Sequence, residues 1–443
     1  MLIEFSVENF LSIGDRVTLS MVPFMSYKEF LDTNTHISES VRANRILTSA
    51  IIYGPNASGK TNIFKAINYM SAFIRSSADE KSEDILNDLS VFGLDPKFNE
   101  QPTRFSISFL FQEFIYHYCF SIKENLINYE ELSIKENKPR QKWSVLYVRD
   151  LDSKQEIWYG PKLKGDRVGI YKKTRPNTLY LSSLYRWNSP IVAEPYEWFE
   201  QHLNSTPDNA PGMYPFTIHR VSESEVFKKK VLDFIQNADI DIEDIEIRRS
   251  VVEGLDLKLK DGAAVVLSNE LLIQRDQKET YSLETKFIHS AEGEEGNKHF
   301  LTVDFNNESE GTQKLFRISG MIIDALEDGD TLLIDELAGN LHPLLTKSIV
   351  KLFHDPQINR KGAQLIFNTH DISLMDPTLY RRDQIWFTDK KKSCMTELFP
   401  LIDFKPKKEE AIRSRYLAGQ YDAIPIIYHR FMVRASKTSN DEE

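Results

Sequence analysis

Phosphate-binding chemistry is expected at one stretch of the sequence. Residues 54–61 read Gly-Pro-Asn-Ala-Ser-Gly-Lys-Thr, which matches the P-loop pattern G-x-x-x-x-G-K-[ST]. Glycines let a backbone wrap closely around a phosphate, and N–H groups at a helix N-terminus attract an anion. Lys60 should reach the β- and γ-phosphates of ATP, and the Thr61 hydroxyl should ligate Mg²⁺. The predicted nucleotide-binding residues are Gly54, Pro55, Asn56, Ala57, Ser58, Gly59, Lys60, Thr61 and Asn62.

A second group of polar residues follows two short apolar runs, 331–334 and 364–367. Buried strands of parallel sheets read as such runs, and ligands bind at their carboxyl ends. Asp335 is therefore predicted to hold Mg²⁺, and Glu336 to orient and deprotonate the attacking water. His370 could contact the γ-phosphate or the water, although a lone histidine is more often a structural hydrogen-bonding residue.

A serine- and glycine-containing turn precedes another helical pattern. Residues 309–313 read Ser-Glu-Gly-Thr-Gln, and apolar residues recur at helical spacing from 314 to 326. A turn of this kind at a helix N-terminus can bind an anion, although such turns are also common helix caps.

Strands and helices must position these residues. The P-loop lies between a predicted strand at 46–53 and a helix whose apolar residues run from Ile63 to Ile74. Alternation predicts a hairpin over 1–22, and another formed by 104–111 and 114–122. The other predictions are a loop over 76–103, further strands to about 148, a helix over 223–237, and strands within 245–305, among them 255–259.

The middle of the chain differs from its two ends. It is rich in proline, and its aromatic cluster is more often a packed core than a binding platform; the cluster is Trp187, Tyr196, Trp198 and Phe199. We expect residues 1–105 and 301–430 to form the two parts of an ATPase head. Residues 106–300 would hold a strand-rich continuation and an inserted α+β domain, and 431–443 a flexible tail.

Composition limits the classes of function. The chain has 443 residues, a net charge of −11 and 41% hydrophobic residues, which suits a folded protein and argues against a surface coated with positive charge. Two distant cysteines, Cys119 and Cys394, fit a reducing compartment. Since no apolar run approaches a membrane span and no signal peptide is visible, we expect a cytoplasmic protein without membrane contact.

The motifs, taken in order, resemble the ABC-like ATPases of the SMC, RecF and OLD group, most closely the stand-alone members of AAA subfamily fifteen. Residues 7–12, 237–244 and 416–425 also look like these relatives. The resemblance implies an α/β fold: an ABC-type P-loop ATPase head with mixed β-sheets, interrupted by an inserted α+β domain.

The resemblance also implies roles for single residues. Residues 54–61 match the Walker A loop, Asp335 the Mg²⁺-binding acid, Glu336 the catalytic glutamate and His370 the switch histidine. The signature residues Ser309, Gly311 and Thr312 would bind the nucleotide held by another subunit. The resemblance therefore implies a homodimer or higher oligomer in which two subunits form each ATP site. Gln101 is our candidate for the Q-loop glutamine near the metal. Residues 337–343 stand at the D-loop position, and their Ala-Gly-Asn turn departs from the more acidic or serine-rich turn of relatives.

Three functions remain open at this stage. The first is a Mg²⁺-dependent ATPase switch that controls a separate effector, a toxin or nuclease, in bacterial anti-phage defence. No nuclease domain is expected in this chain, because no Asp-x-Asp cluster follows the strand at 384–387. The second is a RecF-like DNA-binding ATPase of repair, against which the acidic charge argues mildly. The basic residues from Lys390 to Arg415 could form a phosphate-binding face, but a solvated surface is the simpler interpretation. The third is a nucleotide-gated scaffold with little turnover, which would not need Glu336.

Overall fold

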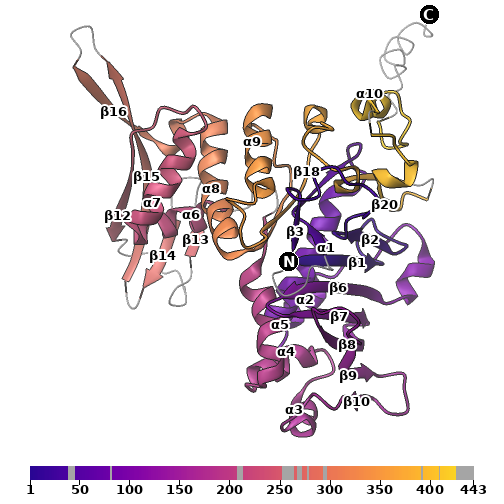
Figure 1. Cartoon of the computed structure of the whole chain (residues 1–443). Coiled ribbons are helices and arrows are strands. Elements are labelled where there is room, and N and C mark those ends of the chain that lie inside the picture. The colour runs from indigo at the N-terminus through magenta and orange to yellow at the C-terminus, as the bar shows by residue number, and fades with distance from the viewer. Residues whose placement is uncertain are drawn as a thin grey trace, which may run out of the picture.

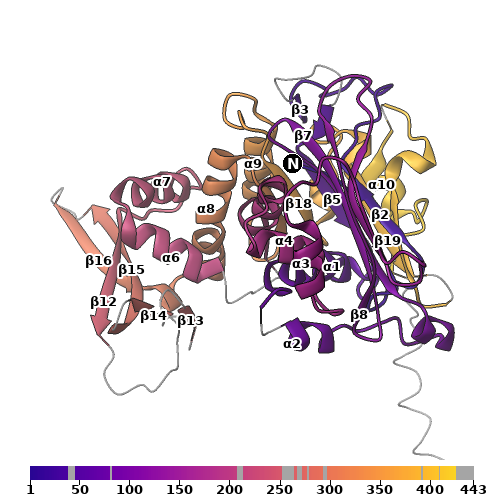
Figure 2. The ribbon, with the colours of Figure 1, turned by 90° about the horizontal axis from the view of Figure 1, so that it is seen from below.

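The computed structural model describes residues 1–37, 45–79, 82–206, 213–251, 264–266, 272–276, 279–292, 297–390, 393–408 and 410–425. The predictions for 255–259 and for the tail at 431–443 lie outside these residues. Figure 1 shows a larger body that contains the N-terminus, and a smaller lobe built from α6, α7 and the sheet of β12 to β16. Figure 2 shows the same two parts from below. The long helix α8 (Glu310–Asp328) lies between the lobe and the body.

A mainly parallel sheet forms the centre of the body. Its strand order is β11-β17-β18-β5-β19-β20, with β20 antiparallel to β19. The bounds are β11 Leu203–Thr206, β17 Thr331–Ile334, β18 Gln364–Asn368, β5 Ser49–Tyr53, β19 Ile385–Lys390 and β20 Thr396–Pro400. Every residue of β5, β17 and β18 is buried, as continuous apolar runs predict.

Alternate residues of these strands enter two separate cores. Ile52 packs in a core shared with the antiparallel sheet, whereas Ile51 and Tyr53 pack in a core shared with α8 and the smaller lobe. Successive side chains of a strand point to opposite faces of the sheet, so both faces of this sheet are buried. Helix α1 (Lys60–Ser76) packs in the first core through the predicted apolar face from Ile63 to Ile74. Helix α9 (Pro343–His354) packs in the second.

An antiparallel sheet covers the other side of α1, in the order β10-β9-β8-β7-β6-β1-β2. The bounds are β1 Leu2–Glu8, β2 Val17–Ser20, β6 Thr103–Phe111, β7 Phe114–Lys123, β8 Leu126–Glu136, β9 Ser144–Asp150 and β10 Ile157–Tyr159. Both predicted hairpins are confirmed. The expected division at 105/106 falls inside β6, which pairs with β1, so residues 103–159 continue the N-terminal sheet. Strands β3 (Thr35–Ile37) and β4 (Arg45–Leu47) form a separate pair.

The predicted loop over 76–103 is wrong at two places. The structure has helix α2 (Ser82–Asn87) and a 3₁₀ turn over Pro96–Glu100. Buried apolar residues hold both segments: Leu86 joins the core of α1, and Phe98 packs against Phe92. Isolated apolar residues within polar sequence carry no periodicity, which is why the pattern misses them.

Short helices connect the two sheets of the body. They are α3 Arg167–Lys173, α4 Tyr180–Arg186, α5 Ala193–Glu197 and the π-helical turn Trp198–His202. Trp198 and Phe199 are fully buried, and the Trp198 ring stacks on Phe109 at 4.0 Å between centroids. The core interpretation of the aromatic cluster is confirmed for these two and for the buried Tyr196, whereas Trp187 is exposed.

The smaller lobe packs on α8. Its elements are α6 Met213–Glu223, α7 Glu225–Gln236, β12 Asp244–Val251, β13 Ala264–Val266, β14 Leu272–Asp276, β15 Glu279–Glu292 and β16 Lys298–Asp304. Helix α7 confirms the helix predicted over 223–237. Arg220 of α6 forms an ion pair of 2.7 Å with Asp324 of α8, and the rings of Phe287 and Phe316 lie 5.3 Å apart. The lobe is therefore joined to the larger body through the helix that carries residues 309–313.

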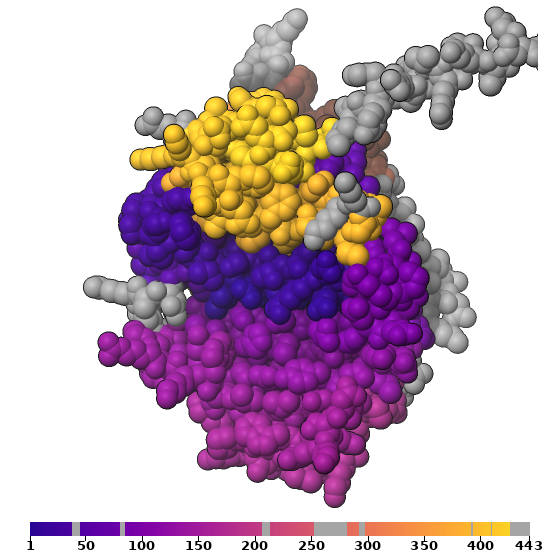
Figure 3. All heavy atoms as spheres, turned by 90° about the vertical axis from the view of Figure 1, so that its right-hand side faces the viewer, coloured from indigo at the N-terminus to yellow at the C-terminus, as the bar shows by residue number. Residues whose placement is uncertain are grey.

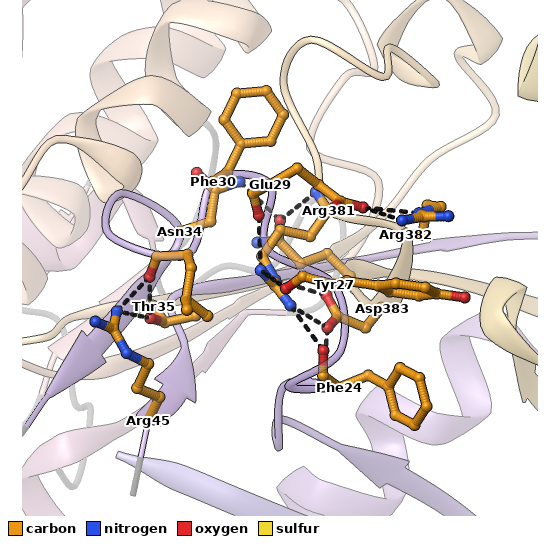
Figure 4. Close-up of polar contacts among 12 residues, drawn as sticks. Phe24, Tyr27, Glu29, Phe30, Asn34, Thr35, Arg45, Arg381, Arg382 and Asp383 are labelled. Carbon is orange, nitrogen blue, oxygen red and sulfur yellow. Dashed lines mark hydrogen bonds and ion pairs between the residues drawn. The ribbon is translucent and has the colours of Figure 1, made fainter. Parts of the chain in front are cut away.

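The C-terminal part of the chain returns to the N-terminal part. Figure 3 shows the yellow C-terminal surface beside the indigo N-terminal surface; α10 (Ile412–Leu417) lies in this region. Beneath it the fully buried Arg381 donates to the carbonyls of Phe24, Tyr27 and Glu29, and pairs with the buried Asp383 at 2.6 Å (Figure 4). Asp383 also accepts from the Phe24 backbone N–H at 2.7 Å. One buried ion pair thus fixes an irregular N-terminal loop.

Asp383→Ala is expected to lower the free energy of unfolding by about 3–5 kcal/mol, because it leaves a buried guanidinium without its counter-charge. Urea unfolding measures the change, and Asp403→Ala, which alters an exposed aspartate close to the same region, is the control and should change stability by less than about 0.5 kcal/mol. A loss below about 1 kcal/mol for Asp383→Ala would show that carbonyl groups alone satisfy Arg381.

Candidate nucleotide-binding site

A cleft of about 600 Å³ opens at the carboxyl ends of β5, β17 and β18. Such ends are where ligands bind in α/β sheets. The lining residues are Ser12, Asn56, Ala57, Ser58, Gly59, Lys60, Thr61, Asn62, Asp335, Glu336, Asn368, His370 and Lys390. The structure therefore brings the P-loop, the acid pair and the histidine into one site, although 274 positions separate Thr61 from Asp335.

The P-loop backbone has the conformation that its glycines permit. Gly59 lies in the left-handed region with φ of 100°, and a Cβ there would stand 2.0 Å from the Thr396 hydroxyl. That hydroxyl donates to the Ser58 carbonyl at 2.9 Å and lies 2.7 Å from the Ser12 hydroxyl. The Ser58 hydroxyl in turn lies 2.6 Å from that of Thr388. Strands β19 and β20 thus form a hydroxyl-lined floor beneath the loop.

Lys60 begins α1 and folds back over the loop. Its ammonium donates to the carbonyls of Gly54 at 2.8 Å and Pro55 at 3.0 Å. Burial lowers the pKa of Lys60, while the nearby Glu336 and Asp335 oppose that change. The ammonium is thus held on backbone carbonyls of the P-loop.

Asp335 and Thr61 supply the oxygen atoms of a candidate Mg²⁺ site. The Thr61 hydroxyl donates to the Asp335 carboxylate at 3.2 Å, and the Asn368 amide donates to the same carboxylate oxygen. Among the residues that the structure describes, no cluster of three or more His, Cys, Asp or Glu could hold a metal. One carboxylate and one hydroxyl fit Mg²⁺, because this ion is usually bound by few protein ligands together with nucleotide phosphates.

Glu336 follows Asp335 in an uncommon backbone conformation. Its φ is 53°, in the left-handed region that a glutamate rarely adopts. Asn368 accepts a hydrogen bond from the Glu336 backbone N–H at 2.8 Å. One carboxylate oxygen accepts, at 3.4 Å each, from the Thr369 hydroxyl and the His370 backbone N–H. The carboxylate is therefore aimed into the cleft from a firmly held backbone.

His370 stands beside Glu336 at the mouth of the cleft. Its Nε2 lies 3.9 Å from the Glu336 carboxylate, and its side chain is 48% exposed. Burial, followed by the charge of Lys60, lowers the pKa of His370, whereas Glu336 and Asp335 raise it. The neutral imidazole, which can both donate and accept a hydrogen bond, is therefore favoured near pH 7.

The signature residues lie away from the cleft of their own chain. Ser309 caps α8, and its hydroxyl accepts from the Thr312 backbone N–H at 3.1 Å. Neither residue, nor Gly311, belongs to the described residues that line the cleft. The same is true of Gln101, whose carbonyl accepts from the Asn9 side chain at 2.9 Å. Gly54 and Pro55 do not line the cleft either, but their carbonyls accept from the Lys60 ammonium. The cleft therefore groups the predicted site residues from Asn56 to Asn62 with Asp335, Glu336 and His370.

Sequence reasoning placed four of the residues at the site nowhere near the P-loop, although for Lys390 it weighed a phosphate-binding face against a solvated surface. Asn368 accepts from the Glu336 backbone N–H and donates to the Asp335 carboxylate. Its position at the end of a predicted strand, two residues before His370, could have indicated a role at the site. Ser12 accepts from Asn62 at 2.6 Å, Lys390 lines the cleft, and Thr396 supports the loop. No local pattern marks these three, because chain folding alone brings them to the P-loop.

Comparisons with known proteins place this geometry in a family. Among curated proteins, no sequence is significantly similar to this chain. A solved structure titled "Crystal structure of the SmcHead bound to the C-winged helix domain of ScpA" is similar with a TM-score of 0.39 and 12% sequence identity. The alignment covers 90% of this chain and 96% of that one.

A family model matches most of the chain. It is described as "AAA domain, putative AbiEii toxin, Type IV TA system" and matches residues 49–376. No described helix is long and apolar enough to cross a membrane. The matched range covers well over half of the chain and includes β5, the P-loop, β17 and β18, so the chain belongs to this AAA domain family. Its fold is α/β, with the P-loop following a strand of a mainly parallel sheet.

Proposed function

We propose that this chain is a Mg²⁺-dependent ATP hydrolase that acts as a dimeric ATP-sandwich switch. One observation carries the proposal: Lys60, Thr61, Asp335, Glu336 and His370 meet in one cleft, whereas the signature turn lies outside it. In this proposal, the cleft holds the groups that bind and hydrolyse a nucleotide. The signature turn at 309–312, which would bind the γ-phosphate from the other side, must then come from a second subunit.

The residues divide the chemistry among them. Lys60 and the P-loop N–H groups bind the β- and γ-phosphates. Thr61 and Asp335 would hold Mg²⁺, which would neutralise charge on the phosphates. Glu336 accepts a proton from the attacking water, and its carboxylate is oriented by Thr369 and the His370 backbone. The His370 ring contacts the γ-phosphate or that water.

A second subunit completes each site in this proposal. The first turn of α8 presents backbone N–H groups and the hydroxyls of Ser309 and Thr312, which lie 2.8 Å apart. A helix N-terminus with free donors attracts a phosphate. Two chains related by a two-fold axis would place this turn of each against the nucleotide of the other, which gives two equal composite sites.

The switch would act on a separate effector. We propose a toxin or nuclease as the effector and bacterial anti-phage defence as the setting. The family description, which names a toxin–antitoxin system, supports this direction. The lobe of α6, α7 and β12 to β16 is the candidate docking surface, because α8 links it rigidly to the signature turn.

Steady-state hydrolysis by the purified chain tests the proposal. ATP turnover should require Mg²⁺, disappear on chelation with EDTA, and rise more than linearly with protein concentration, because the active species is a dimer. Absence of Mg²⁺-dependent turnover over the whole concentration range would overturn the assignment. Salt-sensitive, ATP-stimulated DNA binding by the chain alone would favour the repair function instead.

A further inference from the structure

The backbone of Glu336 is tethered at both ends by side chains of other elements. Asn368 of β18 accepts from its N–H at 2.8 Å, and Lys314 of α8 donates to its carbonyl at 2.6 Å. The Gly339 N–H donates to the same carbonyl at 3.2 Å. A left-handed glutamate persists only where its surroundings hold it, and these contacts hold it.

Lys314 belongs to the same helix as the signature turn. It lies two positions after Thr312, within the first two turns of α8. The helix touches the segment 336–341 at a second point: a Cβ on Gly311 would stand 2.9 Å from the Asn340 carbonyl. A Cβ on Gly339 would stand 3.2 Å from the Lys314 ammonium. The start of α8 and the catalytic segment are therefore in direct contact within one chain.

We propose that Lys314 is a positioning residue that couples the signature turn of a chain to the catalytic Glu336 of the same chain. This inference rests on the function proposed above. When the nucleotide of the partner subunit engages Ser309 and Thr312, α8 is fixed, and Lys314 fixes the Glu336 carbonyl with it. The carboxylate is then aimed correctly in the chain's own cleft, so that occupancy of one composite site controls hydrolysis at the other.

The side-chain chemistry defines the variants. Methionine keeps the length and apolar stem of Lys314 but has no N–H to donate, whereas arginine keeps both a donor and a positive charge. Lys351→Met is the matched control, because Lys351 is an exposed lysine of α9. ATP turnover and hydrogen exchange of the segment 336–341 are measured for each variant. The exchange is repeated with Mg²⁺ and a non-hydrolysable ATP analogue.

Lys314→Met is expected to lower kcat about tenfold while KM for ATP stays within about twofold, since phosphate binding does not involve Lys314. Lys314→Arg should recover most of the loss, and Lys351→Met should match the wild type. The ATP analogue should slow exchange of 336–341 in the wild type but not in Lys314→Met. The backbone hydrogen bonds of Leu337, Gly339 and Leu341 report on this segment.

Two results would overturn the inference. The first is an unchanged kcat in Lys314→Met. The second is a loss of kcat and ATP affinity together that arginine does not restore, which would mark a purely structural residue. A wild type without turnover would instead refute the proposed function. Hydrogen exchange would still test the role of Lys314 in that case. If the ATP analogue slowed exchange of 336–341 equally in the wild type and in Lys314→Met, Lys314 would not couple α8 to Glu336.

Discussion

Glu336→Gln is expected to reduce ATP turnover by about a hundredfold or more, because general-base catalysis of this kind contributes roughly 10²–10⁴-fold to a rate. The amide keeps the size of the carboxylate and can still meet the Thr369 hydroxyl and the His370 N–H, but it cannot take a proton from water. Affinity for ATP should change little, since Lys60, Thr61 and Asp335 are untouched. Phosphate release and the binding of a fluorescent ATP analogue measure the two quantities.

The control for this substitution is Glu327→Gln on α8. Glu327 pairs with Lys230 at the surface, so its replacement removes the same charge without touching the cleft. Turnover of Glu327→Gln should equal that of the wild type. Normal turnover by Glu336→Gln would show that another group, with His370 the nearest candidate, accepts the proton.

Lys60→Ala is expected to weaken ATP binding by roughly 10- to 100-fold, because a hydrogen bond to a charged group contributes about 1.5–3 kcal/mol. In the present structure the ammonium is occupied by the Gly54 and Pro55 carbonyls, and phosphate oxygens would take their place. Isothermal calorimetry with Mg-ATP measures the dissociation constant.

The matched control is Lys65→Ala, an exposed lysine on the same helix. Its affinity for ATP should stay within about twofold of the wild type, because Lys65 does not line the cleft and its exposed charge is weakened by solvent. Equal affinity for ATP in Lys60→Ala and Lys65→Ala would refute the role of Lys60 as the phosphate-binding cation.

The cleft was predictable because its motifs end buried strands. Parallel strands bring their carboxyl ends to one edge, so the apolar runs at 331–334 and 364–367 predicted that Asp335, Glu336 and His370 meet the P-loop. The helix from Ile63 to Ile74 was predictable for a similar reason, since one apolar face must be buried.

The supporting contacts were not predictable, because they depend on pairing between distant segments. Thr396 reaches the P-loop only when β20 pairs with β19, and Ser12 only when the N-terminal turn meets Thr396. Alternation predicted β6 as a strand but not its pairing with β1, so the expected boundary at 105/106 falls within a strand of the N-terminal sheet. A local pattern of apolar residues predicts which residues are buried, whereas the partner of a strand depends on the whole fold.

The buried ion pair of Arg381 and Asp383 is another contact that the sequence pattern does not predict. In the sequence, residues 381–383 are three consecutive charged residues, Arg-Arg-Asp, and no motif singles them out. In the structure its first arginine is fully buried and satisfies the backbone of an irregular loop more than 350 positions away. Charged residues are rarely buried unless they are paired, and no spacing rule predicts such a pairing across the chain.

The mass of the Glu336→Gln protein in solution, measured by light scattering with and without Mg-ATP, tests the central claim most directly. We predict a rise from monomer to dimer when Mg-ATP is added, which is lost when Ser309 is also replaced by arginine in the signature turn. A mass that Mg-ATP leaves unchanged would contradict the ATP-sandwich switch.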